Sequence, residues 1–351
     1  MTTPPLLQRL LTAPGPSGYE TAPALVWREA ASAFAEVTSD TLGSSVARVK
    51  GTSDGPLLAI IGHIDEIGLV VTHIDDSGFL YFAGIGGWDP QILVGQRVEV
   101  ITREGSIAGV IGKKPIHLLK EEDRKQVAKI KDLHIDIGAN DSDDAGALVR
   151  VGDVAVISGE PVALPNGRLA SRSMDNRLGA YIACEAARLV AQAGGAPGDV
   201  AAVAAVQEEI TFGGSQTSAY SLDPAVAIIV DVTHATDAPG IDVKEIGKHE
   251  FGSGAVIDRG STINPMVFEM LHAAAEAEGI AFTVEAHAGR TGTDADAVHL
   301  SRGGFPTGVV SIPLRYMHSP VEMVQLSDVE ACAKLIAAFA MRLPCDVSFE
   351  R

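Results

Sequence analysis

The sequence has few cysteines and few basic residues, and each shortage excludes a class of protein. Its three cysteines, Cys184, Cys332 and Cys345, lie far apart and outside any C-x-x-C pair, which argues against a disulfide framework and a thiolate zinc site. Lysine and arginine total 27 against 45 aspartates and glutamates, a net charge of −18. This charge argues against nucleic acid or an anionic membrane surface as a partner and is compatible with metal binding.

Long apolar runs are also missing. No stretch approaches the ~18 apolar residues that a membrane-spanning helix needs. The first residues, MTTPPLLQRL, lack the basic start and apolar core of a secretory signal, so the expected location is cytoplasmic. The length of 351 residues exceeds the size at which one core stops growing, and it predicts a large domain and a smaller one.

The two flanks of the chain have the pattern of an α/β fold. Short continuous apolar runs, typical of buried parallel strands, occur at residues 57–62, 199–206, 226–230 and 308–313. Helical periodicity separates them at 176–195 and 267–280. These features predict an α/β domain with a mostly parallel sheet covered by helices, formed by residues 1–69 and 166–351.

The middle of the chain, residues 70–165, has a different pattern. It contains alternating stretches with hairpin turns, such as VVTHIDDSGFLYFAG and QRVEVITREGSIAGVIG. The sequence therefore predicts a small β-rich domain inserted into the α/β domain, which we expect to serve oligomerisation or substrate access. Within it, ANDSDDAGALV (139–149) is interpreted as a capped short helix.

Residues that can bind metal follow each of the four apolar runs. They are His63 and Asp65 after the first run, Glu208 and Glu209 after the second, Asp231 after the third and His318 beyond the fourth. Open α/β sheets bind ligands at the carboxyl ends of their strands. We therefore expect these side chains to converge, together with Asp175, which lies at the start of a predicted helix.

The chemistry of this set indicates metal-assisted catalysis. Two histidines and several carboxylates without thiolates suit zinc, cobalt or manganese in an open site. Five or six ligands are too many for one catalytic zinc and fit two ions, which hold a hydroxide between them and polarise a carbonyl. Glu208 and Glu209 then have separate tasks, one as a metal ligand and the other as a general base.

Taken singly, the same residues have structural explanations. A histidine at a strand end is more often a hydrogen-bonded structural residue than a ligand, Asp175 could be a helix cap, and the glutamate pair could be a solvated strand end. Their recurrence at four strand ends favours the metal site. The other histidines, His287 among them, are interpreted as structural, with His117 and His234 left open.

Motifs along nearly the whole chain resemble one family. They are GHIDEIG (62–68), GGWDPQ (86–91), IGKKPIHLL (111–119), SMDNR (173–177), VQEE (206–209), DVT (231–233), GTDADAVHLSR (292–302) and RYMHSP (315–320). Together they resemble the glutamyl aminopeptidase and tetrahedral aminopeptidase family of di-metal metallopeptidases, some of whose relatives have carried an endoglucanase label. The resemblance implies a di-zinc aminopeptidase-like fold and a metallo-aminopeptidase that removes N-terminal residues from peptides.

The resemblance also implies which residues hold the metals. In the family, the residues that match His63 and Asp231 hold one ion, and those that match Glu209 and His318 hold the other. The residue that matches Asp175 bridges them. Two divalent ions per subunit follow, with zinc expected and cobalt or manganese as alternatives.

Further implications concern the catalytic step and the assembly. Glu208 matches the general base, and Asp65 matches the residue that orients the first histidine. A cis peptide is implied between Asp175 and Asn176. Homo-oligomers, among them tetrahedral particles of twelve subunits that admit short peptides, are common in the family.

The chain departs from the family after the glutamate pair. It reads ITFGGSQTSAY (210–220), whereas the family usually has a Gly-Leu-Arg-Gly type of turn there, so the preferred N-terminal residue stays open. Three alternatives also stay open. They are a di-metal deacylase or carboxypeptidase on the same fold, a glycosidase that pairs Glu208 with another acid, and a non-catalytic particle braced by metals.

Overall fold

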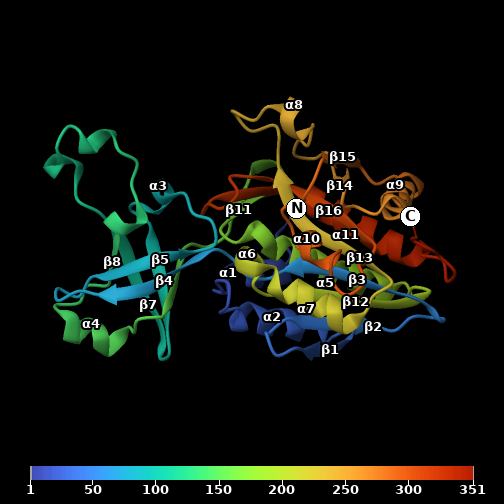
Figure 1. Ribbon diagram of the computed structural model, residues 1–351, viewed down its shortest axis with the longest axis horizontal. Coiled ribbons are helices and arrows are strands. Elements are labelled where there is room, and N and C mark those ends of the chain that lie inside the picture. The colour runs from blue at the N-terminus through green and yellow to red at the C-terminus, as the bar shows by residue number, and fades with distance from the viewer. Residues whose placement is uncertain (1, 351) are drawn as a thin grey trace.

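The computed structural model describes residues 2–350, which form a large sheet covered by helices and a small closed barrel to one side of it (Figure 1). The main path of the large sheet has the order β1-β2-β12-β3-β13-β16-β17-β11-β10, and β14 and β15 extend it from β16. Its strands are β1 (Glu36–Ser39), β2 (Ser45–Val49), β3 (Gly55–His63), β10 (Val162–Leu164), β11 (Arg168–Ser171), β12 (Gly198–Ala205), β13 (Val226–His234), β14 (Ala255–Gly260), β15 (Phe282–His287), β16 (Thr307–Arg315) and β17 (Glu322–Gln325).

The centre of the sheet is parallel and its flanks are not. Strands β12, β3, β13 and β16, which contain the four predicted apolar runs, pair in parallel. On either side, β2, β17 and β14 join this centre antiparallel. The prediction of a mostly parallel sheet is therefore correct for the centre and wrong for the sheet as a whole. Edge strands such as β1 and β10 are short and largely exposed, so they lack the continuous apolar pattern that marks the central strands.

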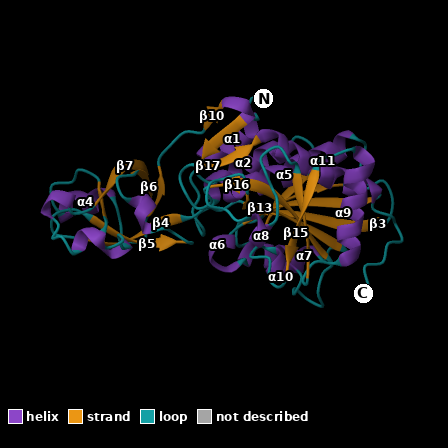
Figure 2. Ribbon diagram, turned by 90° about the horizontal axis from the view of Figure 1, so that it is seen from above, coloured by secondary structure: helices purple, strands orange, loops and turns teal. Residues whose placement is uncertain are grey.

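Helices cover both faces of the sheet (Figure 2). The helices are α1 (Pro5–Thr12), α2 (Thr21–Ala31), α5 (Met174–Gln192), α6 (Glu208–Thr211), α7 (Gly213–Leu222), α8 (Val243–Ile246), α9 (Pro265–Glu278), α10 (Ala295–Val298) and α11 (Leu326–Arg342). The buried α5 packs on β3, β12 and β13 and against α11, while α7 and α10 lie on the other face. The two predicted helices are confirmed as α5 and α9. Among residues 2–350, no helix combines the length and the apolarity that a membrane crossing requires.

The barrel has its own apolar core, and the chain enters it after β3 and leaves it before β10. Its strand order is β4-β5-β8-β7-β6-β9. The elements of this part are β4 (Gly68–Ile74), β5 (Leu80–Ile85), α3 (Pro90–Leu93), β6 (Arg97–Thr102), β7 (Gly105–Gly112), β8 (His134–Asp136), α4 (Ser142–Leu148) and β9 (Val154–Ile157). The predicted capped helix is α4, where the Asp141 side chain accepts a hydrogen bond from the Asp144 N–H.

Helix α5 approaches the central strands closely because glycines meet at the contact. A Cβ atom added at Gly62 on β3 would lie 2.2 Å from the carbonyl carbon of Gly179 on α5. A Cβ atom added at Gly179 would lie 2.4 Å from the Val230 carbonyl oxygen on β13. Both spacings are shorter than real Cβ contacts, so any side chain would separate the helix from the sheet. This contact places the start of α5 against the ends of the central strands.

We expect Gly179→Ala to lower the free energy of unfolding by about 1–3 kcal/mol, because the added methyl group overpacks a rigid backbone contact. Thermal unfolding followed by circular dichroism measures the effect. Gly146→Ala is the matched control, since a Cβ atom there meets nothing within 4 Å on the short helix α4. That control is expected to be neutral or slightly stabilising. Equal unfolding midpoints for both variants and the parent would contradict the close approach.

Candidate active site

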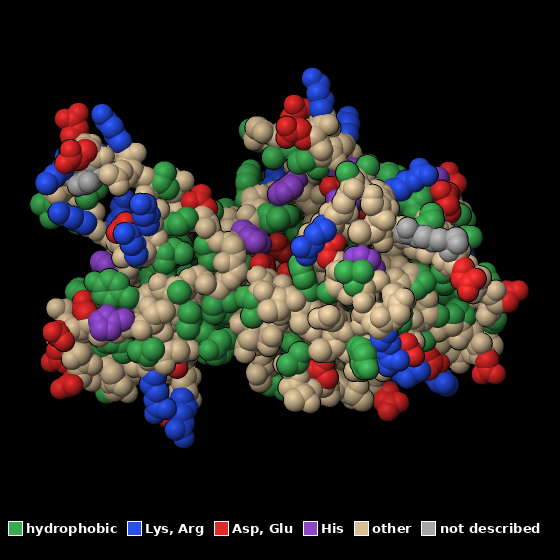
Figure 3. Space-filling view, in the orientation of Figure 1, with side chains coloured by type: hydrophobic (Ala, Val, Ile, Leu, Met, Phe, Trp, Pro, Cys, Tyr) green, Lys and Arg blue, Asp and Glu red, His purple; other side chains and the backbone are tan. Residues whose placement is uncertain are grey.

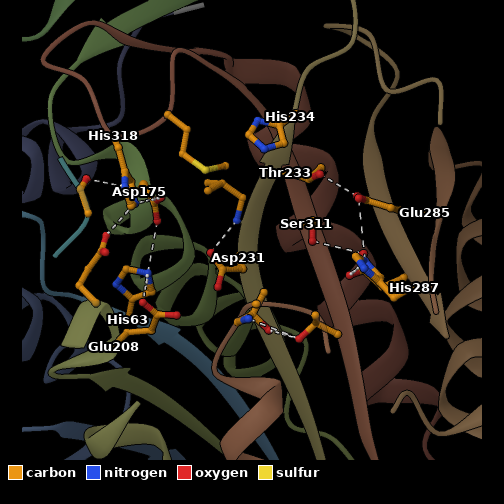
Figure 4. A pocket seen from close by; sticks show the side chains of 18 of the residues that line it. His63, Asp175, Glu208, Asp231, Thr233, His234, Glu285, His287, Ser311 and His318 are labelled. Atoms are coloured by element: carbon orange, nitrogen blue, oxygen red, sulfur yellow. Dashed lines mark hydrogen bonds and ion pairs between the residues drawn. The ribbon is translucent and has the colours of Figure 1, made fainter. Parts of the chain in front are cut away.

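The structure brings the predicted metal-binding side chains together at the carboxyl ends of the central strands (Figure 4). Six of them line one cavity of about 490 Å³: His63, Asp175, Glu208, Glu209, Asp231 and His318. Figure 3 shows acidic and histidine side chains in a hollow near the middle of the molecule. Asp231 lies inside β13, which continues to His234, so this strand extends beyond the predicted run. Asp65 is fully buried behind the cavity.

Asp175 lies between the two histidines. One of its carboxylate oxygens, Oδ1, is 3.3 Å from His63 Nε2, and the other, Oδ2, is 3.4 Å from His318 Nε2. Glu209 Oε1 is 3.3 Å from the same His318 nitrogen, and Glu208 Oε2 is 3.7 Å from His63 Nε2. The peptide between Asp175 and Asn176 is cis, as the resemblance implies. A single carboxylate thus faces two imidazoles with separate oxygens.

The hydrogen bonding of His318 fits a metal ligand. Its Nδ1 lies 2.9 Å from the Gly87 carbonyl oxygen, which can only accept a hydrogen bond, so Nδ1 carries a proton. The lone pair of Nε2 then points at two carboxylates, Asp175 and Glu209. Three electron-rich groups that face one another require a cation between them, either a second proton on the ring or a metal ion.

The electrostatics of the cluster also fit divalent cations. Burial raises the pKa of Glu208 to about 10 and raises the pKa of Asp231 well above its usual range, in each case with a further contribution from neighbouring carboxylates. The carboxylates of Asp175 and Glu209 raise the pKa of His318 to about 11. A cluster that must bind protons to relieve its own repulsion is one that metal ions would stabilise in their place.

The cavity contains two groups of three possible ligands, and each group could hold one metal ion. Their ligand atoms lie within 4.8 Å of one another, in the sets His63, Asp175 and Glu209, and His63, Glu208 and Asp231. All members are buried or nearly so. With His318 beside Asp175 and Glu209, the cavity offers enough nitrogen and oxygen ligands for two ions. The residues therefore fit the metals that the sequence predicts.

Asp65 holds the glutamate turn more directly than it holds His63. Its two oxygens accept hydrogen bonds from the backbone N–H groups of Glu208 and Glu209, both at 3.1 Å, and from the Ser17 hydroxyl. His63 Nδ1 lies 3.4 Å from Asp65 Oδ1 but outside hydrogen-bond geometry. The structure thus adds a second task, the positioning of the turn that carries both glutamates.

Glu322 is a site residue that the sequence analysis missed. This buried carboxylate on β17 accepts the backbone N–H of Asp175 at 3.1 Å and that of His318 at 2.8 Å. Glu322 therefore fixes the backbone of Asp175, which lies between the two imidazoles, and the backbone of His318. No motif identifies it, since its two partners are distant from each other in the sequence.

Strained backbone flanks three of the site segments. Ser173, Gln207 and His318 all have positive φ, at 58°, 61° and 57°. Each such residue costs about 1–3 kcal/mol and persists where its surroundings fix it. At Gln207 the surroundings include Glu20, which accepts the Gln207 backbone N–H at 3.0 Å.

Three other histidines named in the sequence analysis differ in their position relative to the cavity. His117 is exposed on a short 3₁₀ turn of the barrel part, away from the cavity. His234 and His287 both line the cavity, so the interpretation of His287 as merely structural overlooked its position. Glu285, two positions before it, lies on the same face of β15, a signal that the sequence analysis did not use, and the pairing of β15 with β14 adds Asp258. The loop at 291–293 also lines the cavity.

Known proteins resemble this chain over most of its length. Residues 43–335 match the model of the M42 glutamyl aminopeptidase family. Among curated proteins, the lysyl aminopeptidase of Pyrococcus furiosus is 36% identical over 345 residues, which cover 96% of each chain.

Solved structures agree with this match. The TET aminopeptidase of the archaeon Thaumarchaeota archaeon SCGC AB-539-E09 has a TM-score of 0.91 and 35% identity, over 96% of both chains. The TET1 peptidase of Pyrococcus horikoshii, which assembles into a tetrahedron or an octahedral shell, has a TM-score of 0.85 and 32% identity, over 96% of this chain and 99% of that one. The chain belongs to the M42 glutamyl aminopeptidase family of peptide hydrolases.

Proposed function

We propose that this protein is a metal-dependent aminopeptidase that removes N-terminal residues from short peptides. The position of Asp175, with one carboxylate oxygen toward each of two histidines inside an open cavity, is the observation that carries the proposal. It supports a bridging ligand between two divalent ions. His63 and Asp231 would hold one ion, and Glu209 and His318 would hold the other.

The nitrogen and oxygen ligands suit zinc, with cobalt or manganese as alternatives. When bound, such ions supply Lewis acidity, which activates a water molecule and polarises the scissile carbonyl. The ligands lack thiolates and leave solvent space in the cavity, as a catalytic rather than a structural metal site requires.

Glu208 is the proposed general base. Its backbone is held by Asp65, and its side chain lies at the wall of the cavity, 3.7 Å from His63 Nε2. In this role the Glu208 carboxylate takes a proton from the attacking water and delivers it to the leaving amine. Glu209, closer to a histidine, remains a ligand. Asp65 orients both by binding their backbone N–H groups.

We propose further that the chain acts as a homo-oligomer and that residues 70–165 form an inserted domain that serves this assembly or substrate access. This part of the chain exposes large apolar side chains, namely Val110, Ile116, Leu118, Val127 and Leu148. Contiguous exposed apolar groups are typical of interaction surfaces, and Ile116 and Leu118 lie together in one short turn. Tetrahedral particles of twelve subunits are the expected assembly, since the similar TET1 peptidase forms a tetrahedron. A cytoplasmic location stays a prediction.

We expect cleavage of aminoacyl-para-nitroanilides to stop on chelation and to return when zinc, cobalt or manganese is added back, with two ions bound per chain. N-acetylated substrates are the control, because an aminopeptidase needs a free N-terminus. A glycosidase that uses two carboxylates would survive chelation. If metals only brace the particle, chelation would change its size and no substrate would be cleaved. Release of acetate from the acetylated substrates would favour a deacylase.

The variant Glu208→Gln tests the general base. We expect kcat to fall by roughly 10²–10⁴-fold, because the amide cannot accept the water proton, while both ions stay bound. Inductively coupled plasma mass spectrometry measures the metal content. Glu276→Gln on the exposed face of α9 is the matched control, with the same loss of charge. If Glu208→Gln lost a metal ion, Glu208 would instead be a ligand.

The double variant Ile116→Ser with Leu118→Ser tests the assembly. These side chains are 59% and 66% exposed in the single chain, so a change there should weaken contacts between chains and leave the fold intact. Native mass spectrometry should show a large homo-oligomer for the parent and smaller species for the variant. A variant particle of unchanged mass would exclude this surface from the interface.

A further inference from the structure

A second group of ionisable side chains lines the same cavity, on the other side of Asp231 from His63 and Asp175 (Figure 4). It consists of Asp258 on β14 and Glu285 and His287 on β15, whose ligand atoms lie within 4.8 Å of one another. No lysine or arginine lines the cavity in the part of the chain that the structure describes. This end of the cavity therefore has two carboxylates and one imidazole, and it is separate from the proposed metal ligands.

The two carboxylate oxygens of Glu285 have different surroundings. Its Oε2 accepts a hydrogen bond from the Thr233 hydroxyl at 2.7 Å. Its Oε1 lies 3.9 Å from His287 Nε2 and accepts no hydrogen bond from any described residue. Glu285 is 9% exposed and lines the cavity, so this oxygen faces the space of the cavity. A carboxylate oxygen at a cavity wall that accepts no hydrogen bond from the protein is available to a cationic or donor ligand.

Asp258 places a second carboxyl group beside it. This residue is 2% exposed, and its Oδ2 accepts a hydrogen bond from His287 Nε2 at 2.9 Å. Its Oδ1 accepts one from the Ser311 hydroxyl at 3.3 Å. These contacts hold the carboxylate in place and leave it part of the wall of the cavity.

The contacts of His287 favour an organic cation over a metal ion. His318 binds a carbonyl oxygen through Nδ1, which leaves its Nε2 lone pair free toward the carboxylates. His287 instead donates from Nε2 to Asp258, and its Nδ1 binds no acceptor within residues 2–350. The nitrogen that would face a metal is thus already used. Ammonium and guanidinium groups, which donate several hydrogen bonds, match the remaining acceptors better.

The sheet sets the distance between the two ends of the cavity. Asp231 on β13 is the register partner of Ser311 on β16, and the Ser311 hydroxyl reaches Asp258 on β14. Asp231 and Asp258 are therefore two strands apart, about 10 Å at the usual strand spacing. Lysine carries its charge on a flexible four-carbon stem, which suits this span from a backbone held at the metal ligands. Phe212 and Met317 add apolar surface to the same cavity for such a stem.

We propose that Asp258 and Glu285 form the part of the site that selects the side chain of the N-terminal residue, and that the selected side chain is cationic, lysine or arginine. This inference rests on the proposed aminopeptidase function. The names of similar proteins do not settle the preference, since one is a lysyl aminopeptidase and the family is called glutamyl. Glu285 Oε1 and Asp258 bind the charge, and Thr233, Ser311 and His287 position the two carboxylates.

The test compares kcat/KM for lysyl, arginyl, leucyl and glutamyl para-nitroanilides with the metal-loaded parent. We expect lysyl and arginyl substrates to exceed the leucyl one by about tenfold or more, with the glutamyl substrate slowest. In Asp258→Asn and in Glu285→Gln, the lysyl to leucyl ratio should fall roughly tenfold or more, as for the loss of a hydrogen bond to a charged group. The ratio cancels any effect on folding or metal content. Glu276→Gln should leave the ratio unchanged.

The possible failures are distinguishable. Leucyl cleavage by the parent with a lysyl to leucyl ratio of one or less would overturn the cationic preference and leave the aminopeptidase function standing. Unchanged ratios in both variants would remove Asp258 and Glu285 from the selecting role. A third metal ion per chain that is lost in Asp258→Asn would make the group a metal site. Failure of every substrate with a free N-terminus would overturn the proposed function itself.

Discussion

Carboxylates buried at the ends of the central strands are the constraint on which the rest of this structure depends. Glu208, Asp231 and Asp175 lie close together and largely out of water, where like charges repel and cannot be hydrated. Protons or metal ions relieve this repulsion, which is why the pKa values of Glu208 and Asp231 are raised. The surrounding structure holds the acids in place against this repulsion. Asp65 fixes the glutamate turn, and Glu322 fixes the backbone of Asp175 and His318.

The central strands and the site could be predicted from the sequence because both depend on short-range patterns and one geometric rule. Continuous apolar runs gave the four strands, and the rule that parallel strands bind ligands at their carboxyl ends joined residues such as His63 and His318, which are far apart in the chain. The flanks of the sheet could not be predicted in this way. Strands such as β17 are short, and their antiparallel pairing is decided by long-range contacts.

The residues that hold the site in place could not be predicted for the same reason. Glu322 accepts hydrogen bonds from two backbone N–H groups of separate segments, and Gly87, in the motif GGWDPQ, accepts a hydrogen bond from His318 with its carbonyl oxygen. Sequence motifs are recognised by side-chain type, whereas each of these contacts involves a backbone N–H or carbonyl group, which almost every residue has. The interpretation of His287 as structural considers this residue alone, although Glu285 lies two positions before it on the same face of β15. The register that sets β15 beside β14 then adds Asp258, which no local pattern indicates.

The cavity combines two acidic ends that neutral hydroxyl groups separate. Ser311 lies beside Asp231 in the sheet and donates to Asp258, and Thr233 donates to Glu285 from the strand that carries Asp231. These hydroxyls stabilise one set of carboxylates without adding charge near the other. In the proposed function, a substrate with a cationic side chain carries a second positive charge besides its free amine, so both ends attract it. Because the two ends lie on different strands, side chains at one end can change while the backbone that holds the proposed metal ligands stays fixed.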